Sequence, residues 1–167
     1  MKTLIAYGTR FGATAHSAQV LGEELSKTYR HEVLILNASK VTKDDLDWSE
    51  QVIIGSSIVQ GHWKKSSKRL LKLVAKNSKP VAVFVSAAVS LSENIPTEKL
   101  SKECSGEIID RVQYAIEHFV DPICSKYGVE PFAKTAFGGK LSVFGNMIID
   151  NQSDTSIQEW ANKISGA

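Results

Sequence analysis

The chain opens with a short apolar strand that runs directly into a loop of glycine, threonine and small residues. Residues 3–7 are followed by Gly8-Thr9-Arg10-Phe11-Gly12-Ala13-Thr14 and then by an amphipathic helical pattern. A loop of this kind at a helix N-terminus points backbone N–H groups and the positive end of the helix dipole at one place. The opening therefore predicts a strand, a phosphate-binding loop and a helix, in that order.

The residue types in this loop suit a phosphate group. Thr9 and Thr14 offer hydroxyl groups, and Gly12 lets the backbone approach closely. The first N–H groups of the helix have no partner within it. We expect Thr14 to cap the helix and Arg10 either to pair with the phosphate or to lie in solvent. A plain strand-to-helix turn also favours glycine and threonine and is the alternative.

Other phosphate-binding loops are excluded by the residues that they need. No Gly-Lys-Ser/Thr ends the loop, as a nucleoside triphosphate site requires, and Asn37-Ala38-Ser39 stands where a dinucleotide site needs an acidic residue. The ends of the first and third strands lack the acidic residues of a receiver domain, and the first loop lacks the cysteine of a phosphatase. A phosphomonoester therefore fits better than ATP or NAD.

Five apolar runs alternate with amphipathic helical segments along the chain. The runs are near-continuous, as in strands that helices cover on both faces, and they span residues 3–7, 32–36, 51–55, 81–85 and 131–137. This alternation predicts an α/β fold, a doubly wound three-layer sandwich whose five-stranded parallel sheet has the order 2-1-3-4-5. Ligands bind such sheets at the carboxyl ends of the strands, beside strand 1.

Two segments interrupt the pattern. Residues 90–105 form a polar excursion after the fourth strand, in which we expect a short helix, and long loops of this kind often cover ligand sites. Pro122 must end or kink the helix that ends near Phe119, because proline disfavours helical geometry in the residue before it. We expect Asp121 to cap a new short helix that runs through Tyr127.

Length and composition limit the kind of protein. The chain has 167 residues, 43% of them hydrophobic, and a net charge of +2. This is the size of one domain with a sizeable core, so we expect a single domain over residues 1–167. The longest apolar run, residues 81–89, is too short to span a bilayer, and we expect a cytoplasmic protein without a transmembrane segment. Cys104 and Cys124 lack redox-motif spacing and are expected to be free thiols.

The first loop resembles the flavodoxin phosphate loop, T/S-x-T-G-x-T, and the resemblance extends over nearly the whole chain. Phe11 stands where flavodoxins have the middle hydroxyl. The resemblance implies a flavodoxin-like fold with FMN as the cofactor, whose isoalloxazine ring lies between two later loops. It also implies that six residues hold the 5′-phosphate of FMN: Thr9, Arg10, Phe11, Gly12, Ala13 and Thr14.

Residues 55–63, G-S-S-I-V-Q-G-H-W, are similar to the G-x-S-I-x-x-G-H-aromatic segment of the menaquinone-dependent protoporphyrinogen dehydrogenase branch of the flavodoxin superfamily. In that branch the first loop likewise reads S-T-R-x-G-x-T. A long basic and aromatic segment follows its fifth strand, whereas this chain has residues 139–155 there. Trp63 either anchors the next helix in the core or stacks on a ligand. The similarity implies ring contacts from five residues: Ser57, Ile58, Val59, Gln60 and Gly61.

The third loop, residues 86–90, takes the position that meets the pyrimidine edge of the ring in flavodoxins. Its small residues let backbone donors approach the ring, although serine and alanine also simply fill a strand end. The resemblance implies ring contacts from Ser86, Ala87 and Ala88.

Charge is distributed unevenly along the chain. No acidic residue occurs from Gln51 to Ser92, and Lys64, Lys68 and Lys72 follow at helical spacing within that stretch. They form either a solvated helix face or a docking surface for an acidic redox partner protein. We expect no nucleic-acid partner.

Three functions are compatible with these residues. The first is an FMN oxidoreductase of the protoporphyrinogen dehydrogenase or quinone reductase type, which acts on a small redox substrate. The second is a one-electron carrier that serves a redox partner protein. The third is a flavodoxin-like domain that binds a partner without flavin.

Overall fold

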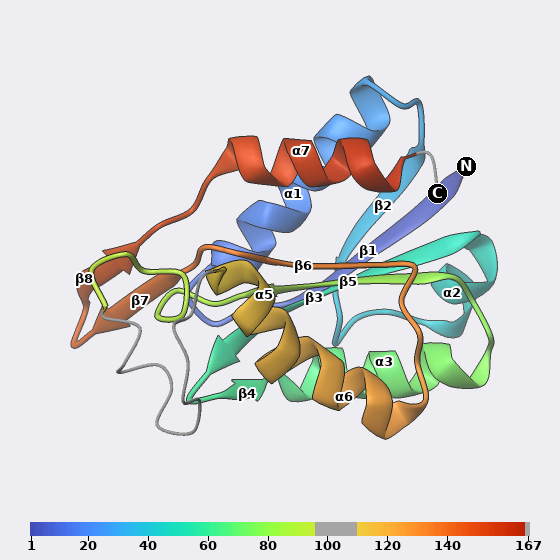
Figure 1. The fold of residues 1–167 in the computed structure, drawn as a ribbon. Coiled ribbons are helices and arrows are strands. Elements are labelled where there is room, and N and C mark those ends of the chain that lie inside the picture. Colours follow the sequence, from blue (N-terminus) through green and yellow to red (C-terminus); the bar gives the residue numbers. More distant parts are fainter. Residues whose placement is uncertain (96–109, 166–167) are drawn as a thin grey trace.

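A computed structural model describes residues 1–95 and 110–165, which form a parallel sheet between two layers of helices (Figure 1). The sheet has the order β2-β1-β3-β5-β6, and the short strand β4 pairs with β3. The predicted doubly wound order is therefore confirmed. The five parallel strands are β1 (Lys2–Gly8), β2 (Glu32–Asn37), β3 (Gln51–Val59), β5 (Val81–Ser86) and β6 (Ala133–Phe137).

Helices cover both faces of the sheet, which explains why the strands are apolar along their whole length. On one face, α1 (Ala13–Lys27) and α7 (Asp154–Ile164) pack over Ile53 and Phe84. On the other face, α3 (Lys65–Lys76) packs over Leu4 and Ile54, together with α2 (Lys43–Trp48). The same face holds a continuous helical segment made of α5 (Arg111–Ala115), the π-helical turn η1 (Ile116–Val120) and α6 (Asp121–Tyr127).

The π turn replaces the break that Pro122 predicts. The N–H of Asp121 donates to the carbonyl of Ile116, five residues back, and Pro122 lies in the first turn of α6, where a missing N–H costs little. The predicted cap at Asp121 is wrong, because its side chain accepts a 2.5 Å hydrogen bond from Lys134 Nζ instead. The π turn thus lets one helical segment pass through the proline.

Two antiparallel pairs were not expected from the sequence. The strand β4 (His62–Trp63) pairs with the end of β3, so residues 56–59, predicted in a loop, belong to a strand. The strands β7 (Lys140–Val143) and β8 (Asn146–Asp150) form a hairpin that projects from the carboxyl edge of the sheet (Figure 1). Residues 96–105 of the predicted excursion, with its short helix and Cys104, lie outside the described residues.

Buried polar side chains at the amino edge of the sheet pair with one another. Gln51 Nε2 donates to Thr3 Oγ1 over 2.9 Å, and Thr3 Oγ1 lies 3.0 Å from His31 Nδ1. All three side chains are buried. Burial lowers the pKa of His31 below its ordinary value, and the positive charge of the N-terminus lowers it further. These buried polar groups are therefore satisfied within the folded chain.

Candidate functional site

The first loop joins β1 to α1 in the way that the sequence predicts, but with a different cap. Gly12 is the N-cap, with a φ of +87° that favours glycine, and its N–H donates to Thr9 Oγ1 over 3.0 Å. Thr14 lies inside the first helical turn, so the prediction that it caps α1 is wrong. The N–H groups of Ala13, Thr14 and Ala15 have no acceptor in the described part of the chain. They are free to bind an anion.

Three buried hydroxyl groups at the carboxyl edge have no hydrogen-bond partner within residues 1–95 and 110–165. They belong to Thr14 at the start of α1, Ser57 on β3 and Ser86 on β5. A buried hydroxyl without a partner costs about 1–3 kcal/mol. Each comes from a different one of the three segments that the sequence singled out, so this edge lacks partners that a bound molecule can supply.

The two serines point to the same side of the sheet. Ser57 and Ser86 are paired in register on neighbouring strands. Successive strand residues alternate between the two faces, so Ser86 shares a face with Phe84, which packs against α1 and α7. Both hydroxyls therefore lie on the face from which α1 directs its N-terminus toward the carboxyl edge.

One cavity of about 470 Å³ connects these segments. Its size is within the range of small-molecule sites, and its walls are mostly apolar. No acidic side chain lines it in the described residues, whereas Arg10 and Lys140 do. Eight of the residues predicted from the sequence line this cavity: Arg10, Phe11, Ile58, Val59, Gln60, Gly61, Ala87 and Ala88.

The other six predicted residues stand next to these in the chain but do not line the cavity. They are Thr9, Gly12, Ala13, Thr14, Ser57 and Ser86. Four of them form the N-terminal turn of α1 with its preceding loop, and the two serines directly precede the cavity-lining residues Ile58 and Ala87. The structure thus separates a part with unpaired N–H donors from an apolar part of the same edge.

Sequence reasoning missed one wall of the cavity. Val89 and Ser90 belong to the third loop, residues 86–90, that the sequence had placed at the ring. The missed lining residues are Phe119, Lys140, Leu141, Ser142 and Val143. The last four belong to β7. Apolar runs on both sides of Gly145 are typical of a hairpin, but Phe144 stands where the turn usually has asparagine or aspartate. Phe119 was visible in the sequence only as a core residue of a helix.

The turn between β3 and β4 forms a second wall. Gln60 and Gly61 have φ values of +50° and +76°, the signature of a two-residue hairpin turn, and both are exposed at the cavity. Trp63 follows, is buried, and donates from Nε1 to the carbonyl of Phe119 over 2.6 Å. Trp63 is therefore the core anchor, and it holds the π turn against this wall.

Asn151 fixes the loop after β5. Its Nδ2 donates to the carbonyl of Ala88 over 3.0 Å, and its Oδ1 accepts from the N–H of Gly139 over 2.8 Å. The N–H of Ala87 donates to the carbonyl of Phe137 over 3.0 Å. These bonds tie the loop to the base of the β7–β8 hairpin, so both walls of the cavity are held in one arrangement.

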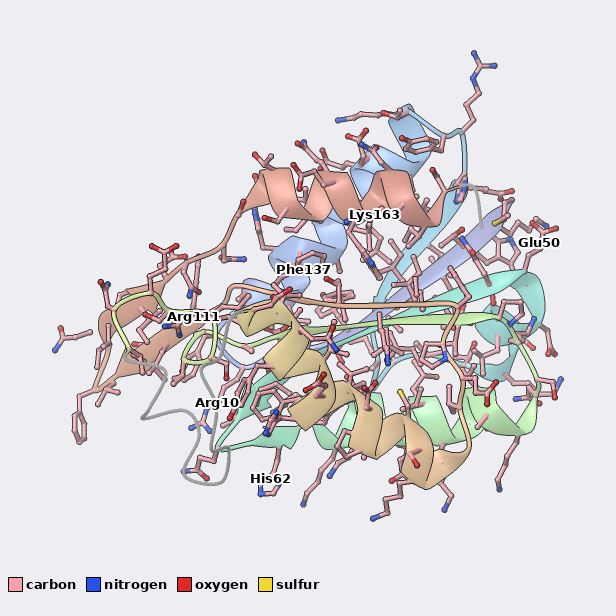
Figure 2. All side chains as sticks on the ribbon, in the orientation of Figure 1. Arg10, Glu50, His62, Arg111, Phe137 and Lys163 are labelled. Atoms are coloured by element: carbon pink, nitrogen blue, oxygen red, sulfur yellow. The ribbon has the colours of Figure 1, made fainter. Side chains whose placement is uncertain are left out.

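Two groups of cations surround the site. Arg10 is exposed, with its guanidinium carbon 5.3 Å from the centre of the Phe11 ring, and Figure 2 shows it at the end of the molecule opposite Glu50. Lys64 packs beside Gly8, where an added Cβ would stand 2.8 Å from that of Lys64. Lys68 and Lys72 continue along α3. Within the described residues none of these three lysines forms an ion pair.

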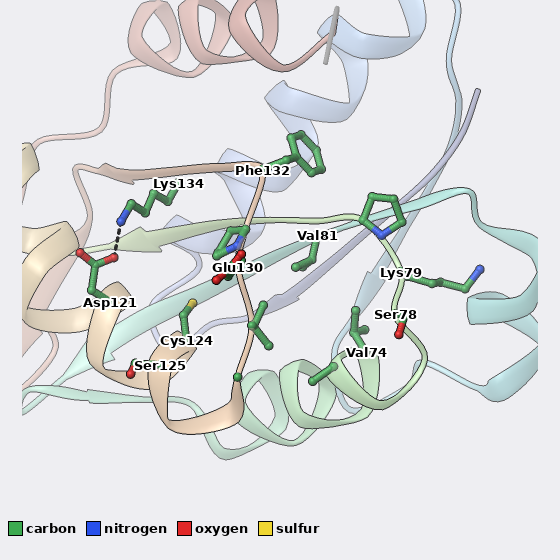
Figure 3. A pocket seen from close by; sticks show the side chains of 15 residues that line it. Val74, Ser78, Lys79, Val81, Asp121, Cys124, Ser125, Glu130, Phe132 and Lys134 are labelled. Atoms are coloured by element: carbon green, nitrogen blue, oxygen red, sulfur yellow. Dashed lines mark hydrogen bonds and ion pairs between the residues drawn. The ribbon is translucent and has the colours of Figure 1, made fainter.

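A larger cavity, of about 1,020 Å³, lies elsewhere, between the C-termini of α3 and α6 and the start of β5 (Figure 3). Asp121 in its wall forms an ion pair with Lys134. Cys124 in its wall is buried, and desolvation raises the pKa of its thiol to about 11, so the thiol stays protonated at neutral pH. We place the functional site at the carboxyl edge, where the unpaired donors are.

The fold is that of a doubly wound α/β protein, and its carboxyl edge carries a largely apolar cavity beside unpaired N–H and hydroxyl donors. Residues 4–143 match the family model of the flavodoxin domain, so the chain belongs to the flavodoxin-domain family. No curated protein matches this chain in sequence. In the part of the chain that the structure describes, no helix has the length and apolar character needed to cross a membrane.

Solved flavodoxins share the fold at low sequence identity. A flavodoxin from the domain Archaea is 16% identical, with 99% of this chain and 97% of that chain covered and a TM-score of 0.59. The Streptococcus pneumonia flavodoxin is 13% identical, with 99% of each chain covered and a TM-score of 0.61. Rubredoxin oxygen:oxidoreductase from Desulfovibrio gigas is 13% identical at a TM-score of 0.61, and this chain spans 35% of its length.

Proposed function

We propose that this chain is a cytoplasmic single-domain protein that binds FMN and acts as an FMN-dependent oxidoreductase on a small redox substrate. The main support is the set of three buried, unpartnered hydroxyls on Thr14, Ser57 and Ser86. They come from three separate segments of one edge, and membership in the flavodoxin-domain family makes FMN the ligand to test first. The similarity of residues 55–63 favours a porphyrinogen or quinone as the substrate.

The phosphate of FMN would bind at residues 9–14. The unpaired N–H groups of Ala13, Thr14 and Ala15 are donors at the positive end of a 15-residue helix. Thr14 adds a hydroxyl, and Thr9 holds the loop through its bond to the Gly12 N–H. Arg10 is long enough and free enough to contribute charge from the exposed side.

The flavin ring would bind in the apolar part of the edge, held by residues 57–61 and 86–88. The side chains of Ile58 and Val59 and the small residues Ala87 and Ala88 give this part an apolar surface that excludes water. The bonds from Asn151 fix the wall at Ala88. FMN, when bound, supplies the redox chemistry, and these residues bind and orient it.

The absorption spectrum of the purified protein tests this proposal. We expect flavin bands, or, if FMN is lost during purification, quenching of FMN fluorescence when the protein is added. A Thr14→Val/Ser86→Ala variant keeps the side-chain shapes and removes two donors, so its FMN affinity should fall. A colourless protein that leaves FMN fluorescence unchanged would favour the flavin-free binding domain.

A one-electron carrier is the second candidate, and the basic face of α3 favours it. Lys64, Lys68 and Lys72 repeat at i, i+4 spacing, and no acid from residues 51–92 offsets them. A field of one sign speeds the encounter with an oppositely charged partner and is screened by salt. An acidic redox protein would therefore dock at this face.

A small anionic electron acceptor tests the basic face of α3. The reduced FMN-loaded protein should be oxidised more slowly by anionic ferricyanide as salt rises, and this salt dependence should weaken in a Lys64→Gln/Lys68→Gln/Lys72→Gln variant. The matched control is Lys27→Gln/Lys40→Gln/Lys163→Gln, which removes the same charge from other exposed sites. Equal salt dependence in both variants would remove the argument for docking at α3.

A further inference from the structure

The β7–β8 hairpin carries an apolar cluster that water surrounds. Phe144 at its turn is 99% exposed, and Met147 and Ile148 are 54% and 58% exposed. With Val143 they are four of the eight large apolar residues exposed in the described part of the chain. An exposed cluster of this kind marks an interaction site. We call these four residues the apolar tip.

Folding of the hairpin does not explain Phe144. The two-residue turn between β7 and β8 has φ values of +48° at Phe144 and +80° at Gly145. Asparagine accepts the first of these conformations readily, whereas a bulky side chain is strained there. Phe144 therefore gains neither backbone stability nor packing at this position, and its apolar ring points to a role outside the folded chain.

The apolar tip has exposed side chains on both faces of the hairpin. Ser142 pairs with Met147, so these two share a face. Val143 follows Ser142 in the strand and points to the opposite face. Phe144 lies in the turn that joins the two strands. A protein partner that packs on one face leaves the other in water, whereas the interfacial layer of a bilayer surrounds the tip on all sides.

The charges around the tip match an anionic lipid surface. Residues 141–149 contain no charged side chain, and the ion pair of Lys140 with Asp150, over 3.7 Å, lies at the base of the hairpin. Arg10 and Lys140 are the charged residues that line the neighbouring cavity. An uncharged tip beside the exposed Arg10 is complementary to apolar acyl chains below anionic headgroups.

We infer that the apolar tip inserts into the interfacial layer of a bilayer with anionic headgroups, while Arg10 lies against those headgroups. Interfacial segments of this kind bury about 5–10 Å of their apolar side. Because Leu141 and Val143 also line the cavity, docking brings the cavity to the membrane surface. The protein would then bind membranes reversibly through one hairpin, independently of whether it holds FMN.

Phe144→Asn is the decisive variant because the two roles of this position respond in opposite directions. Asparagine relieves the strain of the turn, so the midpoint of urea unfolding should rise. Loss of the ring should weaken cosedimentation with vesicles of equal parts phosphatidylcholine and phosphatidylglycerol by about tenfold or more. Wild-type binding should also weaken with added salt and on pure phosphatidylcholine vesicles.

The matched control is Phe132→Asn, which replaces an exposed phenylalanine at the amino edge of the sheet, and it should bind vesicles like the wild type. The inference is overturned if the wild type does not cosediment with the anionic vesicles, or if Phe144→Asn binds them equally well. It is also overturned if sedimentation velocity shows a dimer that Phe144→Asn dissociates, because the tip would then be an interface between two copies.

Discussion

The two edges of the same sheet treat buried polar groups in opposite ways. At the amino edge, Thr3, His31 and Gln51 are buried and hydrogen-bonded to one another. At the carboxyl edge, Thr14 and Ser86 are buried without partners in the described part of the chain. A folded chain keeps an unpaired buried hydroxyl only at a free-energy cost. The comparison teaches that the first edge serves stability, whereas the second keeps donors free for the ligand that we propose.

Gly12→Asp should have the largest effect, because it places a side chain and a negative charge at the anion site. Like charges about 4 Å apart at an effective dielectric near 20 repel by roughly 4 kcal/mol, which is about a thousandfold in affinity. We expect no FMN binding in a fluorescence titration. Gly128→Asp is the control, since it adds the same charge at a positive φ away from the site. Unchanged FMN affinity in Gly12→Asp would show that the phosphate does not bind at the first loop.

Riboflavin should bind much more weakly than FMN, because it lacks the phosphate. Charge-assisted hydrogen bonds contribute about 1.5–3 kcal/mol each, so the loss should be about a hundredfold or more. Parallel titrations of the apoprotein measure the difference. In the Gly12→Asp variant the preference for FMN over riboflavin should disappear. If the wild type binds both flavins equally, the ring contacts dominate and the first loop is only a turn.

A pair of threonine substitutions tests the two edges directly. Thr14→Val should stabilise the free protein by about 1 kcal/mol, since it removes an unpaired hydroxyl, and should weaken FMN binding by a similar amount. Thr3→Val should destabilise the protein by about 1–3 kcal/mol, because it leaves the amide of Gln51 unpaired, and should not change FMN affinity. Urea unfolding measures the stability of each variant, and FMN titration measures its FMN affinity. Equal responses at the two edges would contradict the comparison.

The smallest effect concerns pH and the amino edge. The pKa of His31 is lowered in the folded protein, so the unfolded chain binds a proton more readily. Stability is therefore complete above the ordinary histidine pKa of about 6.5 and falls as the pH decreases through that value. Urea unfolding at several pH values should show this slope in the wild type and less of it in His31→Gln. His118→Gln, at an exposed histidine, should keep the full slope.

The sequence predicted the parts of the fold that depend on burial alone. Strands covered on both faces are apolar throughout, so β1 and β5 were visible as continuous runs. The end of β3 was missed because Ser56 breaks its apolar run, although its hydroxyl is paired with the N–H of Lys64 over 2.9 Å. The conformational preference of proline predicts that the helix ends or kinks at Pro122. It does not predict the π turn, which lets the helical segment continue. Local residue preferences do not reveal these long-range compensations.

The candidate site was predictable where chemistry depends on neighbouring residues. The first loop was predicted from six consecutive residues, 9–14. The ring contacts of residues 57–61 and 86–88 were predicted from the resemblance to flavodoxins. The wall formed by β7 was missed because Phe144 violates the residue preference of its turn. Phe119 lines the cavity because it lies in the π turn and because its carbonyl accepts a hydrogen bond from Trp63. Phe119 and Trp63 are far apart in the sequence, so local patterns did not predict this contact.

The parallel order of the sheet has a consequence for folding during synthesis. β1 pairs with both β2 and β3, whereas β5 and β6 add afterwards on the far side of β3. A nascent chain that ends after β4 therefore has β2-β1-β3 available for pairing but an open β3 edge, which is a template for other chains. We expect ribosome-released fragments that end at residue 63 to aggregate, and fragments that extend beyond β6 to stay dispersed.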